Sequence, residues 1–89
     1  MKKIVMYGSK LCEDTCEAQE VFAKNNIEYT YLDITEDLEN LAKFLRHRDS
    51  NPIYREKREN GGIGIPCIEV NDGEKLFLGL DEETLNSLK

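Results

Sequence analysis

The chain has 89 residues, of which 39% are hydrophobic and 34% are charged, and its formal net charge is −6. This length predicts a single domain spanning residues 1–89, because so short a chain encloses only one core. The acidic balance argues against nucleic acid as a partner, since contact with phosphates needs clustered lysine and arginine. The apolar run after the first lysines is shorter than a signal-peptide core or a membrane helix, so we expect a cytoplasmic protein without membrane contact.

The first half of the chain predicts two strands that alternate with two helices. Residues 3–7 form an apolar run that Gly8 ends, which is typical of a central strand. Residues 12–24 lack glycine and proline and have apolar positions at helical spacing, with Asn25 and Asn26 at the end. Residues 28–34 favour a second strand. We expect Thr35 to cap the next helix, whose apolar face would consist of Leu38, Leu41, Ala42 and Leu45.

The second half predicts a short helix, a hairpin and a final helix. Asn51 and Pro52 favour a helix start, and the charged run 55–59 that follows is expected to be a solvated face. Two strand-like segments flank a turn with Asp72 and Gly73, a strong hairpin signal. Asp81 precedes a last acidic helical turn. This order predicts an α/β domain in which a parallel strand pair and an antiparallel hairpin share one mixed sheet.

Cys12 is the strongest candidate for chemistry, because it falls where the first strand has ended and a helix begins. A helix N-terminus stabilises a thiolate, which is the nucleophile of disulfide exchange. Cys16 lies one helical turn later, roughly 6 Å along the axis, so the two thiols are within reach of a disulfide. Glu13 and Asp14 disfavour a thiolate, whereas Lys10 favours it. The alternative is that Cys16 is a core thiol and Cys12 an incidental surface one.

The third cysteine, Cys67, follows Pro66. Three cysteines do not suit a closed framework of structural disulfides, and we expect Cys67 to be a buried strand residue. The pair Ile65-Pro66 favours either the start of an edge strand or a cis turn. From these residues alone, the edge strand is the safer interpretation.

The single histidine, His47, stands between Arg46 and Arg48 at the end of a predicted helix. We expect it to be a solvated cation favoured by the helix dipole. A zinc site built from His47 and the three cysteines would match no common zinc module, so no metal is predicted.

Several separated segments resemble a glutaredoxin: residues 6–16, 27–29, 32–34, 65–66 and 79–82. The resemblance implies a thioredoxin fold, in which a four-stranded mixed sheet of order 2-1-3-4 is flanked by three main helices plus one short extra helix. It also implies a thiol–disulfide oxidoreductase that reduces glutathione mixed disulfides, protein disulfides or both. Glutathione would be the reductant, with disulfide-containing or glutathionylated proteins as partners, no bound cofactor and a monomeric chain.

The resemblance further implies the roles of individual residues. Cys12 would be the nucleophile and Cys16 the resolving thiol. The glutathione site would be formed by Lys10, Ile65, Pro66, Gly79, Leu80 and Asp81.

Two other functions stay open. In a redox-responsive binding module with little turnover, Cys12 and Cys16 would switch between thiol and disulfide while the charged segment 46–59 docks a partner. An arsenate-reductase-like thiol enzyme is the third alternative, because Tyr7-Gly8 and Thr15-Cys16 are similar to the opening of that branch of the fold.

Overall fold

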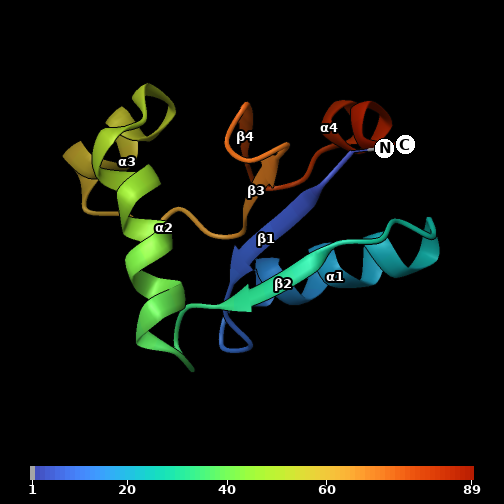
Figure 1. Cartoon of the computed structure of the whole chain (residues 1–89), viewed down its shortest axis with the longest axis horizontal. Coiled ribbons are helices and arrows are strands. Elements are labelled where there is room, and N and C mark those ends of the chain that lie inside the picture. Colours follow the sequence, from blue (N-terminus) through green and yellow to red (C-terminus); the bar gives the residue numbers. More distant parts are fainter. Residues whose placement is uncertain (1) are drawn as a thin grey trace.

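The computed structural model describes residues 2–89 and contains one sheet with helices on both faces (Figure 1). The strands are β1 (Ile4–Gly8), β2 (Thr30–Asp33), β3 (Cys67–Val70) and β4 (Lys75–Leu78). The helices are α1 (Glu13–Lys24), α2 (Leu38–Ser50), α3 (Arg55–Asn60) and α4 (Glu82–Leu88). A 3₁₀ turn, η1 (Pro52–Tyr54), joins α2 to α3.

The strand order in the sheet is β2-β1-β3-β4, which confirms the predicted fold class. The central strand β1 pairs with β2 in parallel, with Met6 opposite Tyr31. It pairs with β3 in the antiparallel sense, with Tyr7 opposite Cys67. The hairpin β3–β4 completes the sheet. Its turn contains two non-glycine residues with positive φ, Asn71 and Asp72, followed by Gly73 at φ 90°, as expected from the turn chemistry.

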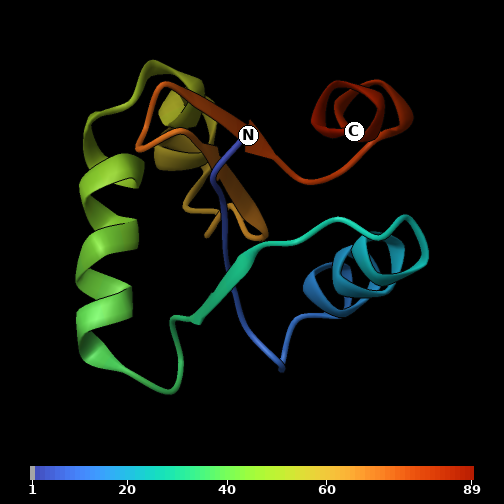
Figure 2. The ribbon, with the colours of Figure 1, turned by 45° about the vertical axis from the view of Figure 1, so that its right-hand side comes forward.

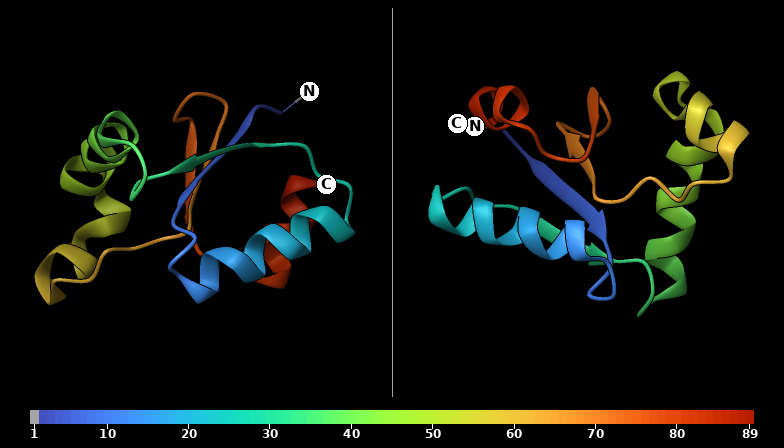
Figure 3. Two further views of the ribbon diagram at one scale, coloured as in Figure 1. Left: turned by 90° about the horizontal axis from the view of Figure 1, so that it is seen from below. Right: turned by 180° about the vertical axis from the view of Figure 1, so that it is seen from behind.

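Two apolar clusters lie on the opposite faces of the sheet. Helices α1 and α4 cover one face and bury Phe22 and Leu88 against Met6 and Ile68 (Figure 2). Helix α2 covers the other face together with the η1–α3 segment, as Figure 3 shows from two further sides. There the aromatic rings of Phe44 and Tyr54 meet edge to face, with their centroids 5.9 Å apart. The sheet is therefore the middle of three layers.

The start of α2 differs from the prediction. Asp37, not Thr35, caps this helix, and its Oδ1 accepts a hydrogen bond from the Glu39 N–H at 2.7 Å. The predicted apolar face is correct only in part: Leu41 packs against the core, whereas Leu38 in the first turn is 82% exposed and Leu45 is 37% exposed. Phe44 is the residue of α2 that is fully packed against the sheet.

Pro66 does not begin an edge strand. It precedes β3, which has a neighbouring strand on each side, so that interpretation is wrong. The Ile65–Pro66 peptide bond is cis, the other alternative that the sequence left open.

Candidate active site

The loop from Ser9 to Cys12 turns the chain from the end of β1 into α1. The Cys12 N–H donates to the Ser9 carbonyl at 3.0 Å, and the Leu11 N–H donates to the Ser9 hydroxyl at 3.0 Å. Cys12 is the N-cap residue of α1 and is partly exposed. Its side chain makes no capping hydrogen bond, so its sulfur lies at the positive end of a twelve-residue helix without accepting a backbone N–H there.

Asp33, at the end of β2, holds this loop in place. Its carboxylate accepts hydrogen bonds from the Lys10 N–H at 2.9 Å, from the Thr35 N–H at 2.8 Å and from the Tyr31 hydroxyl at 3.1 Å. Burial by itself would raise the pKa of Asp33, but hydrogen bonds from Thr35, Lys10 and Tyr31 outweigh it and lower the pKa to about 2. A buried carboxylate therefore fixes the backbone two residues before Cys12.

Thr15 and Cys16 occupy opposite environments in the first turns of α1. Thr15 is fully buried, and its hydroxyl lies 3.4 Å from the Ser9 N–H that points to it. Cys16 is exposed, and its thiol lies 3.6 Å from the Lys10 carbonyl oxygen. Thr15 thus faces the core of the protein, while Cys16 lies on the outside of the helix against the loop that precedes Cys12. Both cysteines are free thiols.

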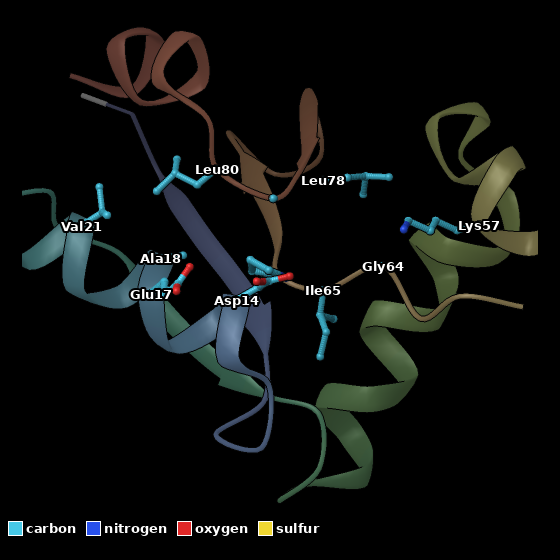
Figure 4. Close-up of a pocket in the computed structure, with 11 residues that line it drawn as sticks. Asp14, Glu17, Ala18, Val21, Lys57, Gly64, Ile65, Leu78 and Leu80 are labelled. Carbon is cyan, nitrogen blue, oxygen red and sulfur yellow. The ribbon is translucent and has the colours of Figure 1, made fainter. Parts of the chain in front are cut away.

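A groove of about 400 Å³ begins beside the first turn of α1 (Figure 4). Four of the six residues predicted to bind glutathione line it: Ile65, Pro66, Gly79 and Leu80. The Gly79 N–H donates to the Pro66 carbonyl at 2.8 Å, so the end of β4 is tied to the cis-proline turn. In the β1–β3 register, the position after Tyr7–Cys67 sets Gly8 opposite Pro66, which brings this turn to the end of β1 that leads to Cys12.

The other two predicted residues do not line this groove. The Lys10 ammonium lies 2.7 Å from a Glu36 carboxylate oxygen in an exposed ion pair. Asp81 caps α4, where its carboxylate accepts the Thr84 N–H at 2.7 Å, and this hydrogen bond lowers the pKa of Asp81. In their place, Lys57 from α3 contributes the cation of the groove.

Comparison with known proteins agrees with this architecture. No protein-family model matches the chain. A Haemophilus influenzae protein described as uncharacterized is 28% identical over 74 residues, which cover 83% of this chain and 86% of that protein. The glutaredoxin of Archaeoglobus fulgidus has a TM-score of 0.68 at 21% identity, covering 99% of this chain and 86% of its own. The chain is glutaredoxin-like in its fold.

Two further solved structures agree. The glutaredoxin of Methanosarcina mazei has a TM-score of 0.70 at 18% identity over 96% of this chain and 75% of its own. A mutant of a thioredoxin-like protein has a TM-score of 0.62 at 25% identity over 99% of this chain and 95% of its own.

On the face of this glutaredoxin-like sheet that α2 covers, Cys67 is fully buried, as predicted. Burial raises the pKa of the Cys67 thiol to about 11; a hydrogen bond from Tyr54 opposes the rise and the charge of Glu69 adds to it. The prediction for His47 is wrong. Its Nε2 lies 2.9 Å from a carboxylate oxygen of Glu69, which also accepts the Tyr7 hydroxyl at 3.1 Å. His47 is therefore a partly buried member of a polar cluster with Glu69 and Tyr7 rather than a solvated side chain.

Sequence reasoning missed Asp33, Thr15 and Lys57. A polar residue at the end of a strand next to the loop is a weak signal for Asp33, whereas nothing local distinguishes Lys57 from its charged neighbours. Among residues 2–89, no group of three or more histidine, cysteine or acidic side chains could hold a metal ion. No helix in the same range combines the length and the apolar character needed to cross a membrane.

Proposed function

We propose that this protein is a thiol–disulfide oxidoreductase in which Cys12 is the nucleophile. The observation that carries the proposal is the position of Cys12, which is partly exposed at the N-terminus of α1, the helix whose first turn borders a groove lined by the cis-proline turn. Disulfide exchange begins with the attack of a thiolate on a disulfide sulfur, which requires an accessible cysteine of this kind.

The proposed reaction begins when the Cys12 thiolate attacks the glutathione sulfur of a protein–glutathione disulfide. The disulfide bond breaks, the protein sulfur leaves as a thiolate that takes a proton from water, and Cys12 is left bonded to glutathione. The thiolate of a second glutathione molecule then attacks the glutathione sulfur that is bonded to Cys12. This attack releases the Cys12 thiolate and glutathione disulfide. The protein sulfur is thereby reduced to a thiol, the sulfur of the incoming glutathione is oxidised, and the glutathione sulfur of the substrate stays at the disulfide level.

Cys16 is proposed to act only on protein disulfides, where it would displace the substrate from Cys12 and close a Cys12–Cys16 disulfide. The exposed thiol of Cys16 lies near the loop that precedes Cys12, which supports this role. Glutathione would bind along Ile65, Pro66, Gly79 and Leu80, which together line the groove.

Lys10 and Asp81 are proposed to contribute to glutathione binding, although neither residue lines the groove. The exposed pairing of Lys10 with Glu36 is weak enough to be exchanged for a substrate carboxylate. Lys10→Glu should then slow turnover of a glutathione mixed disulfide at low salt, and added salt should mask part of the loss.

The decisive experiment compares cysteine variants on two substrates, a peptide–glutathione disulfide and a protein disulfide. Cys12→Ser should abolish turnover of both. Cys16→Ser should retain much of the activity on the glutathione disulfide and lose reduction of the protein disulfide. Cys67→Ala is the matched control, because its buried thiol faces the opposite side of the sheet and should leave both activities intact.

Retained activity in Cys12→Ser would overturn the assignment of the nucleophile. Reversible Cys12–Cys16 oxidation without turnover on either substrate would instead favour the redox-responsive binding module.

A further inference from the structure

Charges of opposite sign stand on facing walls of the groove. Asp14 and Glu17 project from α1 on one side, and Lys57 projects from α3 on the other (Figure 4). Asp14 belongs to the first turn of α1, the helix that begins after Cys12, so the acidic wall is the one on the helix that carries the reacting cysteine. The side chains between the walls are apolar and include Pro66 and Leu80.

The position of Lys57 follows from the fold of the loop after α3. Gly61 adopts the left-handed conformation with φ 75° and ends the helix, and the Gly62 N–H donates to the Lys57 carbonyl at 2.9 Å. The stem of Lys57 packs over Gly62, where an added Cβ would lie 3.0 Å from the lysine Cδ. The loop itself is held by Arg48, whose guanidinium donates to the Gly62 carbonyl. The conformation of this loop and its hydrogen bonds to Arg48 therefore direct the Lys57 side chain toward the groove.

None of these three groove charges forms an ion pair with another residue of the described part of the chain. Over residues 2–89, the ion pairs include neither Asp14 nor Glu17 with any cation, nor Lys57 with any carboxylate. The two walls also do not pair with each other. All three side chains are exposed and solvated, so a charged molecule that enters the groove can pair with them without breaking an ion pair of the protein.

We propose that the groove selects a protein segment whose disulfide cysteine is flanked by lysine or arginine; this inference rests on the proposed function. The acidic wall on α1 attracts the cationic head, and the apolar side chains between the walls accept the aliphatic stem of such a side chain. Lys57 on the far wall receives a carboxylate and orients the segment. Glutathione has more carboxylates than ammonium groups, so the acidic wall favours a basic protein segment over it.

The test uses symmetrical disulfides of three short peptides that differ only in the residues beside cysteine, which are lysine, glutamine or glutamate. A symmetrical disulfide gives the same product whichever sulfur Cys12 attacks. The measured quantity is the second-order rate constant of the reduced protein with each peptide. Lysine-flanked peptide should react faster than glutamate-flanked peptide, and salt should compress the difference.

Charge-neutralising variants then test the assignment. Asp14→Asn with Glu17→Gln should lower the lysine-to-glutamate rate ratio by about two- to fivefold for each charge removed. Lys57→Gln should raise the same ratio, because it removes the attraction for glutamate. Glu20→Gln is the matched control, since Glu20 is exposed on α1 but does not line the groove, and it should leave the ratio unchanged. Intrinsic differences in peptide reactivity cancel when variants are compared with the wild type.

The outcomes separate the two proposals. If the glutamine-flanked disulfide is not reduced by Cys12, the proposed function fails. If it is reduced but the ratio is the same in the wild type and in the Asp14→Asn/Glu17→Gln variant, the function stands and the selection of basic segments is overturned.

Discussion

Replacing Asp33 by asparagine tests whether a buried carboxylate holds the loop before Cys12. The carboxylate accepts two backbone N–H groups through different oxygens, Lys10 on Oδ2 and Thr35 on Oδ1. A carboxamide has one acceptor oxygen, so in Asp33→Asn one of these N–H groups meets an NH₂ donor and loses its partner.

The expected cost follows from the lost interaction. A hydrogen bond to a charged group contributes about 1.5–3 kcal/mol, so the free energy of unfolding at pH 7 should fall by about 2 kcal/mol. Urea unfolding followed by circular dichroism measures this change. Asp49→Asn is the matched control, because that carboxylate is exposed and lies 3.8 Å from Arg48, and it should change stability by less than about 0.5 kcal/mol.

The pH dependence provides a second arm of the same test. The pKa of Asp33 is lowered from 3.8 to about 2 in the folded protein, where burial is outweighed by hydrogen bonds from Thr35, Lys10 and Tyr31. A depressed pKa contributes stability that is fully present above pH 3.8 and is lost as the pH falls through 2. The wild-type advantage over Asp33→Asn should therefore shrink between pH 4 and pH 2. A loss below about 0.5 kcal/mol at pH 7, or a difference that does not change with acid, would refute the reasoning.

Three further predictions concern the surroundings of the site. Gly8→Ala should cost about 1–3 kcal/mol, because the new methyl group collides with Thr15 Cγ2, and Thr15→Ser in the same chain should restore part of the loss in thermal unfolding. His47→Ala should lower the free energy of unfolding by about 1–3 kcal/mol, because it removes a partner of the buried Glu69 carboxylate; with Glu69→Gln already present, the same change should cost less. Iodoacetamide at pH 8 should label the active-site thiols much faster than Cys67, whose pKa burial raises to about 11, and equal rates in the native protein would contradict its burial.

The elements of this fold were predictable because their signals are local. The hairpin follows from residues that tolerate positive φ, Asn71 to Gly73, placed between two apolar runs. Asn26, with φ 56°, ends the turn after α1 in the left-handed conformation that asparagine tolerates. The placement of Cys12 before a helix was equally visible, because a helix start depends on a few neighbouring residues. For α2 the same local rules predicted Thr35 as the capping residue, whereas Asp37 caps the helix.

Only the tertiary structure determines the contacts between residues that are far apart in the sequence. Thr35 is unavailable as a cap because Asp33 binds both its N–H and its hydroxyl. His47 packs against the sheet because β3 places Glu69, 22 residues away in the sequence, within hydrogen-bond distance of its ring. Lys57 becomes a groove residue because the loop after α3 turns its stem toward the cis-proline segment. The burial of a side chain, its hydrogen-bond partner and its electrostatic surroundings depend on which surfaces are packed together. No periodicity or spacing along the chain encodes these properties individually.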